Sequence, residues 1–213
     1  KAGNLDLRQG FGLAAEGIFV KKKRSALNYT LTELSRETAA LTGFVQEEIK
    51  KLSFEKLNQR PANGGWSLLE CLEHLNRYSA YYNPALEKAI TENPRKKAAQ
   101  EITLTWLGKK SVEMITPKNT KKHKTIKKMN PQGSILQASV VDVFLKYQQQ
   151  LQHLLEKANG TELGKKTVPV EFFRLLKMNT GETLLFMVLH QQRHFLQLQR
   201  IFAEVTSGKK VVA

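Results

Sequence analysis

Cysteine is almost absent from this chain of 213 residues: Cys71 is the only one, so no disulfide can form within the chain. We therefore expect a protein of the reducing cytoplasm. Long apolar runs are missing as well, since the longest, residues 184–189, is far shorter than the roughly 20 residues that cross a bilayer. Residues 1–24 hold no compact apolar segment followed by a cleavage site. The sequence thus predicts neither a membrane span nor an export signal.

Acidic residues are scarce relative to basic ones, 19 against 34, which gives a formal charge of +15. Most of the excess lies in two segments. Residues 95–128 carry eleven basic and two acidic residues, and residues 1–24 carry six and two. Positive charge therefore gathers in a connection and at the start of the chain rather than along one helix face, which argues against a helix that reads nucleic acid.

Residues 1–24 show no sustained hydrophobic period, and we interpret them as a leader, of cloning origin or incompletely processed, that is not part of the fold. The remainder, residues 25–213, is long enough for one domain with a hydrophobic core. Four segments of it have apolar residues at helical spacing: about 30–57, 67–92, 134–158 and 180–205. The first two open with capping boxes, formed by Thr30 with Glu33 and by Ser67 with Glu70.

A long connection, residues 95–133, separates the second and third predicted helices and holds two prolines and the lysine runs. We expect a loop there, with a short helix or strand near residues 102–107. The last helix is apolar on most sides and should be the most buried of the four. The sequence predicts an all-α fold, a four-helix bundle with at least one long crossover connection.

Two of the five histidines, His190 and His194, are four residues apart on the predicted last helix. Both imidazoles then lie on one face, one turn apart, where two nitrogens can reach one metal ion. A buried histidine is also satisfied by hydrogen bonds within a core, so the pair alone leaves both interpretations open. His74, in the second helix, can supply a third nitrogen, but its meeting with the pair does not follow from the spacing. We expect His123 and His153 to be solvated.

Two groups of residues form a recognisable pattern. The first, around the second helix, comprises Arg60, Pro61, Trp66, Ser67, Glu70, His74 and Leu75. The second, in the last helix, comprises His190, Arg193, His194, Gln197, Arg200 and Ile201. Together they resemble the signatures of the DinB/YfiT-like family, over about residues 25–202. The resemblance implies an antiparallel four-helix bundle whose His74, His190 and His194 bind one divalent metal ion, and it makes a homodimer plausible.

Three imidazole ligands leave a divalent ion open positions for water or substrate, which is typical of catalytic rather than structural sites. Zinc and nickel are the metals we expect first, and iron and manganese are also compatible with imidazole. A bound water or thiol could lose its proton near neutral pH. The resemblance implies metal-dependent hydrolases and transferases that use a small cytoplasmic thiol, so we predict a small-molecule substrate.

Glu70 is our candidate catalytic base, because it lies on the same side of its helix as His74. Its alternative role is to complete the capping box of Ser67. The segment between His190 and His194 lacks the internal glutamate of His-Glu-x-x-His metalloproteases, which excludes that class.

Other polar and aromatic residues near the histidines have less specific roles. We expect Glu73 at the surface. Arg193 either pairs at the surface, which we favour, or holds a substrate carboxylate, and Gln197 either orients a ligand or packs between helices. Cys71 should be a buried apolar side chain, and Trp66 should pack before the helix cap, outside the site. The remaining aromatic residues either line a pocket or belong to the core: Tyr78, Tyr81 and Tyr82.

Three functions follow from these observations. The first is a metal-dependent enzyme that acts on a small molecule. The second is a metal-binding bundle without catalytic activity, whose site serves stability or sensing. The third is a nucleic-acid-binding accessory protein that uses the lysines of residues 95–128. We do not favour the third, since the lysine runs lack interleaved aromatic residues.

Overall fold

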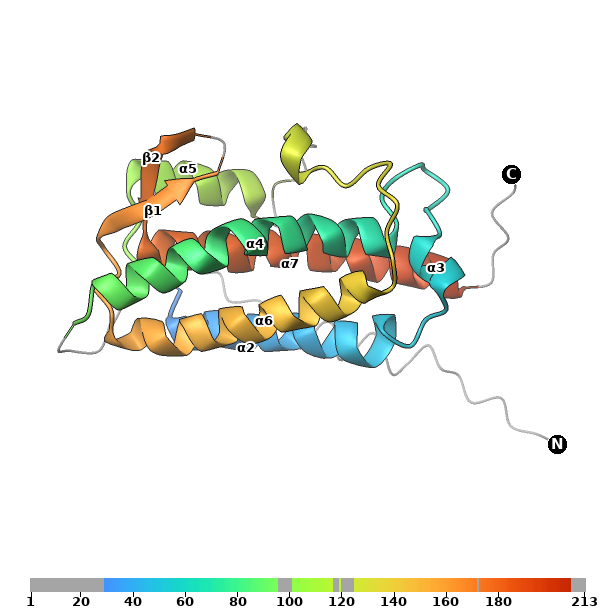
Figure 1. Ribbon diagram of the computed structural model, residues 1–213, viewed down its shortest axis with the longest axis horizontal. Helices are drawn as coiled ribbons and strands as arrows, with labels where there is room; N and C mark the ends of the chain where they lie inside the picture. The colour runs from blue at the N-terminus through green and yellow to red at the C-terminus, as the bar shows by residue number, and fades with distance from the viewer. Residues whose placement is uncertain (1–28, 96–100, 117–118, 120–124, 172, 208–213) are drawn as a thin grey trace.

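The computed structural model describes residues 29–95, 101–116, 119, 125–171 and 173–207. Their fold is mainly helical, with a body of four long helices (Figure 1): α2 (Leu31–Phe44), α4 (Leu68–Glu92), α6 (Ser139–Lys157) and α7 (Thr180–Thr206). The segment that we interpreted as a leader, residues 1–24, lies outside the described residues.

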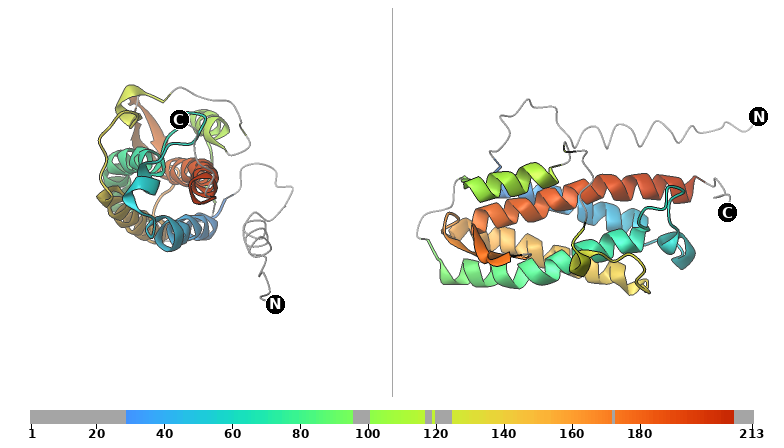
Figure 2. Two further views of the ribbon diagram at one scale, coloured as in Figure 1. Left: turned by 90° about the vertical axis from the view of Figure 1, so that its right-hand side faces the viewer. Right: turned by 90° about the horizontal axis from the view of Figure 1, so that it is seen from above.

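The four long helices form a closed square when viewed along their axes, because α2 and α4 each pack against both α6 and α7 (Figure 2). α4 and α7 are antiparallel: Cys71 near the start of α4 contacts His194 late in α7, and the Tyr82 ring lies 5.7 Å from that of Phe186. α2 and α6 are antiparallel as well, since Ser35 pairs with Gln152. These two helix pairs follow the antiparallel arrangement that the family resemblance implies.

α4 and α6, in contrast, run in the same direction. Asn76 donates a hydrogen bond to the Val140 carbonyl at 3.1 Å, and seven residues later Asn83 donates to the Tyr147 carbonyl at 3.3 Å. The bundle is therefore not antiparallel at every contact. A chain that leaves the end of α4 must return along the whole bundle before α6 can start, which is why the connection between them is long.

The first predicted helix, about residues 30–57, is divided in the structure. α2 continues into one π-helical turn, η1 (Val45–Ile49), after which the chain turns into the separate short helix α3 (Phe54–Asn58). Ser53 caps α3 by accepting a hydrogen bond from the Lys56 N–H. A serine that caps a new helix competes with continuation of the old one, so the expectation of a single helix is wrong.

α6 begins five residues later than Ser134, where the sequence analysis placed its start. The Ser134 N–H closes a turn on the Pro131 carbonyl at 2.9 Å, and Gly133 has φ +79°, a conformation that glycine adopts readily. Ile135 is 95% exposed. Ile135 therefore does not belong to the buried face of the helix, although Leu136 next to it packs against the core from outside the helix.

The connections contain more structure than the sequence analysis predicted. The element expected near residues 102–107 is the start of α5 (Trp106–Ile115), which packs against α7, and η2 (Lys127–Met129) follows it. Between α6 and α7 lie η3 (Ala158–Gly160) and an antiparallel hairpin of β1 (Lys166–Val170) and β2 (Phe173–Asn179). The all-α prediction therefore missed a small sheet.

The hydrophobic core has two clusters. One gathers around the second half of α4, the first half of α7, α5 and the hairpin, with Tyr82, Leu86 and Met187 among its members. The other gathers around the first half of α4 and the second half of α7, and includes Leu72 and Phe195. The two helices thus pass from one apolar cluster to the other where they cross the middle of the bundle.

α7 is the longest helix of the described residues, with 27 residues, and most of its first half is buried. Even so, none of the helices in the described parts of the chain combines the length and apolar character needed to cross a membrane.

The start of α7 is fixed by a buried carboxylate. Glu182 is fully buried and accepts hydrogen bonds from the N–H groups of Asn179, at 3.0 Å, and Thr105, the residue before α5. A Cβ at Gly108 would collide with this carboxylate. Glu182 therefore caps α7 and anchors α5 to it.

We predict that Glu182→Ala lowers the free energy of unfolding by about 2 kcal/mol, because a buried N–H group, that of Asn179, and a partly buried one, that of Thr105, lose their acceptor. Urea denaturation measures the change. The matched control is Glu33→Ala, which removes the same capping-box partner at the exposed start of α2 and should cost clearly less. Equal costs for the two variants would contradict a role for Glu182 in anchoring α5.

Candidate metal centre

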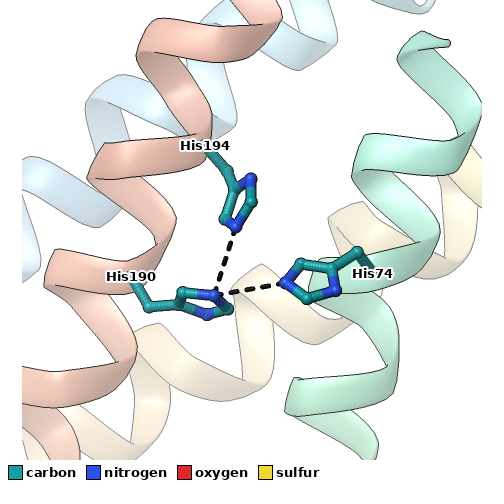
Figure 3. A group of neighbouring side chains, drawn as sticks. All are labelled: His74, His190 and His194. Atoms are coloured by element: carbon teal, nitrogen blue, oxygen red, sulfur yellow. Dashed lines mark hydrogen bonds between the residues drawn. The ribbon is translucent and has the colours of Figure 1, made fainter. Parts of the chain in front are cut away.

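The three predicted histidines converge between α4 and α7 (Figure 3). His74 Nε2 and His194 Nε2 each lie 3.2 Å from His190 Nε2. One ligand atom of each ring lies within 4.8 Å of the other two. The prediction that His74 meets the pair on the last helix is thereby confirmed.

The antiparallel packing of α4 and α7 explains this convergence. The pair separated by four residues occupies the face of α7 that contacts α4, so both rings point into the helix interface. At the same level of α4 stand His74 and Tyr78, whose ring centroid lies 4.4 Å from that of His190. One residue of α4 is therefore enough to complete a set of three nitrogens.

The outer nitrogens of two rings are held by hydrogen bonds. His74 Nδ1–H donates to the Met129 carbonyl at 2.7 Å, and His194 Nδ1–H donates to Gln197 Oε1 at 3.0 Å. A neutral imidazole has only one N–H, so both rings turn an Nε2 lone pair inward. Partners of this kind orient metal-binding histidines in proteins.

The third ring has no such partner: His190 Nδ1 is buried and makes no hydrogen bond within the described residues. Even if His190 carried its proton on Nε2, the three converging nitrogens would share a single N–H. Two nitrogens bound to a tetrahedral zinc at about 2.0–2.1 Å lie about 3.3–3.4 Å apart, close to the observed 3.2 Å separations. The donor set therefore fits one divalent cation.

All three imidazoles are neutral at physiological pH, which is the form that binds metal. Burial lowers the pKa of His74 to about 4, against a smaller raising effect of its bond to Met129. Burial likewise lowers the pKa of His194 to about 3 and that of His190 well below its usual value. The proximity of the rings adds to the shift in the last two.

Side chains on one face of α4 form hydrogen bonds to the backbone of a segment of the long connection. Glu70 accepts a hydrogen bond from the Gly133 N–H at 3.3 Å, and Arg77 donates to the Asn130 carbonyl at 2.8 Å. His74, between them on the same face, donates to Met129. These contacts fix the backbone that orients the His74 ring, a role that the sequence analysis missed because the partner is a carbonyl group.

Glu70, our candidate base, has several other partners. One of its oxygens accepts a hydrogen bond from the Ser67 N–H at 2.9 Å, and the carboxylate forms a bidentate ion pair with Arg60. The geometry therefore gives Glu70 the capping role that we weighed as its alternative, and in addition an anchoring role toward Arg60 and Gly133. Its function as a base stays a prediction. Glu73 pairs with Arg77 at 2.9 Å.

Aromatic rings surround the histidines. Trp66 stacks on His194, with centroids 5.9 Å apart, and lies 4.8 Å from His74. We expected Trp66 to lie outside the site, and the structure corrects this: the residue before the helix cap reaches the histidines because the cap lies only two turns from His74. On the other side, Phe186 stacks on His190 at 5.7 Å.

Three other candidates have clear positions. Cys71 is buried, as expected, and burial raises the pKa of its thiol; its Sγ lies 3.7 Å from His194 Nδ1, the nitrogen that faces away from the set. Gln197 orients His194. Arg193 is only partly exposed and donates to the carbonyls of Thr116 and Asn119, so it holds the end of α5 rather than pairing at the surface.

A cavity of about 340 Å³ opens beside the histidines, which form part of its wall. α4 contributes Tyr78 and Tyr82, and α7 contributes Phe186 and Arg193. The connections supply the remaining lining residues: Ser111, Met114, Ile115, Thr125, Ile126, Val170, Glu171 and Met178. This volume suits a small organic molecule. The pocket role that we left open for Tyr78 and Tyr82 agrees with this lining, which does not include Tyr81.

Of the two remaining histidines, the structure describes only His153. His153 is exposed on α6, with its Nδ1 3.9 Å from Glu156, as expected of a solvated side chain. His123 lies outside the described residues, as do six of the basic residues of the long connection: Lys96, Lys97, Lys118, Lys121, Lys122 and Lys124.

A helical bundle with three inward-facing imidazole nitrogens beside a cavity defines a class of protein that can hold a divalent ion on one side of a small-molecule pocket. The sequence matches the DinB superfamily over residues 33–198. The chain therefore belongs to this superfamily, which is metal-binding. Neither the curated proteins nor the solved structures contain a match to it.

We predict that the metal-free protein loses stability as the pH falls from 7.5 to 5. The pKa of His74 lies near 4 in the folded chain, below its usual 6.5. The unfolded chain therefore takes up a proton first, and stability falls as the pH drops below about 6.5. His74 alone accounts for about 2 kcal/mol at pH 5.

Urea denaturation in the presence of a chelator, at both pH values, measures this loss. Comparison with His74→Leu separates the contribution of His74 from that of the carboxyl groups, and this variant should lose less stability on acidification than the parent. Identical pH dependence in the two proteins would show that His74 is not the titrating group. His153→Gln, at an exposed position, should behave like the parent.

Proposed function

We propose that this chain binds one divalent metal ion with His74, His190 and His194 and acts on a small molecule, as a hydrolase or a thiol-dependent transferase. The proposal depends on one observation: the converging nitrogens of the three histidines have too few N–H groups to hydrogen-bond to one another. Three Nε2 atoms converge, and two of them belong to rings whose only N–H points outward. A cation satisfies all three lone pairs at once.

The ligand type favours zinc or nickel, and iron or manganese also accept imidazole. Three protein ligands leave coordination positions open, as in catalytic sites. When bound, a divalent ion supplies Lewis acidity, which lowers the pKa of a water or thiol beside it. Hydrolysis and thiol transfer both depend on that effect, so both reactions are compatible with the same three histidines.

The residues around the histidines have separate tasks in this proposal. Met129 and Gln197 fix the rings of His74 and His194. Trp66 and Phe186 cover the set and exclude water on two sides. Water exclusion strengthens every electrostatic interaction within the site. The cavity then binds the substrate against the remaining side.

We also propose the extent of the domain, its cellular location and its oligomeric state. We propose one domain from residue 25 onward, since the described helices pack around shared core clusters. A cytoplasmic location is supported by the single cysteine, a buried free thiol. A homodimer is supported by the family resemblance alone.

The central test is metal content. We predict that protein purified without an affinity tag carries close to one equivalent of zinc or nickel, and that His190→Ala carries less than about a tenth of that, because one of three ligands is gone. Elemental analysis by mass spectrometry measures both. His153→Ala, which removes an exposed histidine, is the control and should retain the metal.

Activity is tested separately on the metal-loaded protein with a panel of small esters, amides and electrophiles, each with and without a low-molecular-weight thiol. Turnover that needs the thiol identifies a transferase, and turnover without it identifies a hydrolase. Metal bound at full occupancy without turnover of any substrate would favour the inactive bundle that we weighed as an alternative.

Gln197 provides a second prediction about the site. Gln197→Leu removes the acceptor that fixes the His194 ring, so metal affinity should fall by roughly 10- to 100-fold while the fold is preserved. Competition with a chromogenic chelator measures the affinity. Gln149→Leu, exposed on α6, is the matched control. Unchanged affinity in Gln197→Leu would mean that the hydrogen bond does not orient the ligand.

A further inference from the structure

The cavity beside the histidines contains one acidic residue among the side chains that line it, Glu171. Its walls are otherwise mainly apolar or aromatic, with Ile115, Val170 and Met178 from three different elements. The one full positive charge in the lining is that of Arg193, whose guanidinium donates to backbone carbonyls at the end of α5. Arg193 thus has hydrogen-bond partners within the protein, and the question is which group pairs with Glu171.

Glu171 lies at the turn between β1 and β2, and its backbone is tied to the cavity wall. Its N–H donates to the Tyr82 hydroxyl at 3.2 Å. Its Oε2 is buried and has no hydrogen-bond partner within the described residues. Burial raises the pKa of this carboxyl group, although the positive charge of Lys128 lowers it in part. A buried acceptor without a donor is unfavourable, and a ligand that donates a hydrogen bond to it removes that penalty.

The surroundings of the carboxylate suit a cation. The negative charge of Glu171 acts on the hydroxyl groups of Tyr78 and Tyr82, and the two rings lie 6.2 Å apart in a stacked arrangement. Ring faces attract ammonium groups in places where water is excluded. Tyr78 also contacts His190, with centroids 4.4 Å apart. An aromatic wall therefore connects the carboxylate to the histidine set.

Lys128 does not form an ion pair with Glu171 in the structure. Its Nζ lies 5.8 Å from the centre of the Tyr81 ring, and the ion pairs of the described residues do not include the two together. Lys128, the cation whose charge acts on the carboxyl group, therefore does not supply the donor that Oε2 lacks.

We propose that Glu171 binds the ammonium group of the substrate, so that the site takes a small amine with an apolar or aromatic body. The proposal rests on the proposed function, since it assumes that the histidine set is the reacting end of the same cavity. The amine N–H donates to Oε2, the body lies against Tyr78 and Phe186, and the other end of the molecule faces the histidines.

The experiment uses the full chain loaded with zinc and two probes of nearly equal shape, 2-phenylethylammonium and 2-phenylethanol. Ligand-observed NMR titration measures the dissociation constants. We expect the parent protein to prefer the ammonium by at least about tenfold, as for a charge-assisted hydrogen bond. In Glu171→Gln the preference should fall below about threefold, and in Glu171→Asp it should be partly retained. Glu162→Gln, which removes an exposed charge just before the hairpin, should match the parent.

Equal affinity of the parent for both probes, or an undiminished preference in Glu171→Gln, would overturn the proposal. Tighter binding of phenylacetate than of the ammonium by chelator-treated protein would also overturn it, and would assign charge selection to Arg193. Zinc content is measured on the same samples. Absence of zinc from the parent refutes the proposed function whatever the probes do, whereas full zinc content without ammonium preference refutes the role of Glu171 alone.

Discussion

Three imidazole nitrogens with at most one N–H among them occupy a small space between α4 and α7, and the arrangement around them depends on that constraint. Lone pairs that face one another repel, so the rings stay together only if a cation joins them or the scaffold holds them. The scaffold does much of this holding. Trp66, Tyr78 and Phe186 confine the rings laterally, while Met129 and Gln197 fix the outer nitrogens. The protein thus presents the neutral, oriented donors that a divalent ion requires.

The bundle separates stability from this polar site. One apolar cluster lies on each side of the histidines along α4 and α7. The packing of these two clusters offsets the unfavourable free energy of burying three imidazoles. The connections have a different task. The long segment after α4 supplies the carbonyl that orients His74, and the connecting segments, with α5 and the hairpin, supply eight of the fifteen residues that line the cavity. Helices therefore provide the donors, and the connecting segments define the space in front of them.

Local signals explain what the sequence could predict. The capping boxes at Thr30 and Ser67, the spacing of His190 and His194, and the apolar character of α7 depend on residues close in the chain, and the structure contains each of them. The start of α6, the division of the first helix and the hairpin were not predicted, because a turn at Gly133 and a cap at Ser53 override apolar periodicity. In β1 the buried residues Val168 and Val170 alternate with Pro169, but this pattern in the sequence is too short to predict a strand. Glu171 carries no local signal at all, since only the folded hairpin brings it to the cavity.

The family signature describes the metal centre more than the reaction. Its residues on α4, just before α4 and on α7 include the three ligands, the ring that covers them and the amide that orients one of them: His74, His190, His194, Trp66 and Gln197. Residues that would choose a substrate lie mainly between the helices, in α5, the segment before η2 and the hairpin, which the signature does not cover. A match to the superfamily therefore supports metal binding, whereas the choice of substrate depends on the residues of the cavity wall. In that wall the single carboxylate is the feature with the most chemical information, because an apolar surface accepts ligands of many kinds, whereas a carboxylate with a buried, unpaired oxygen accepts few partners.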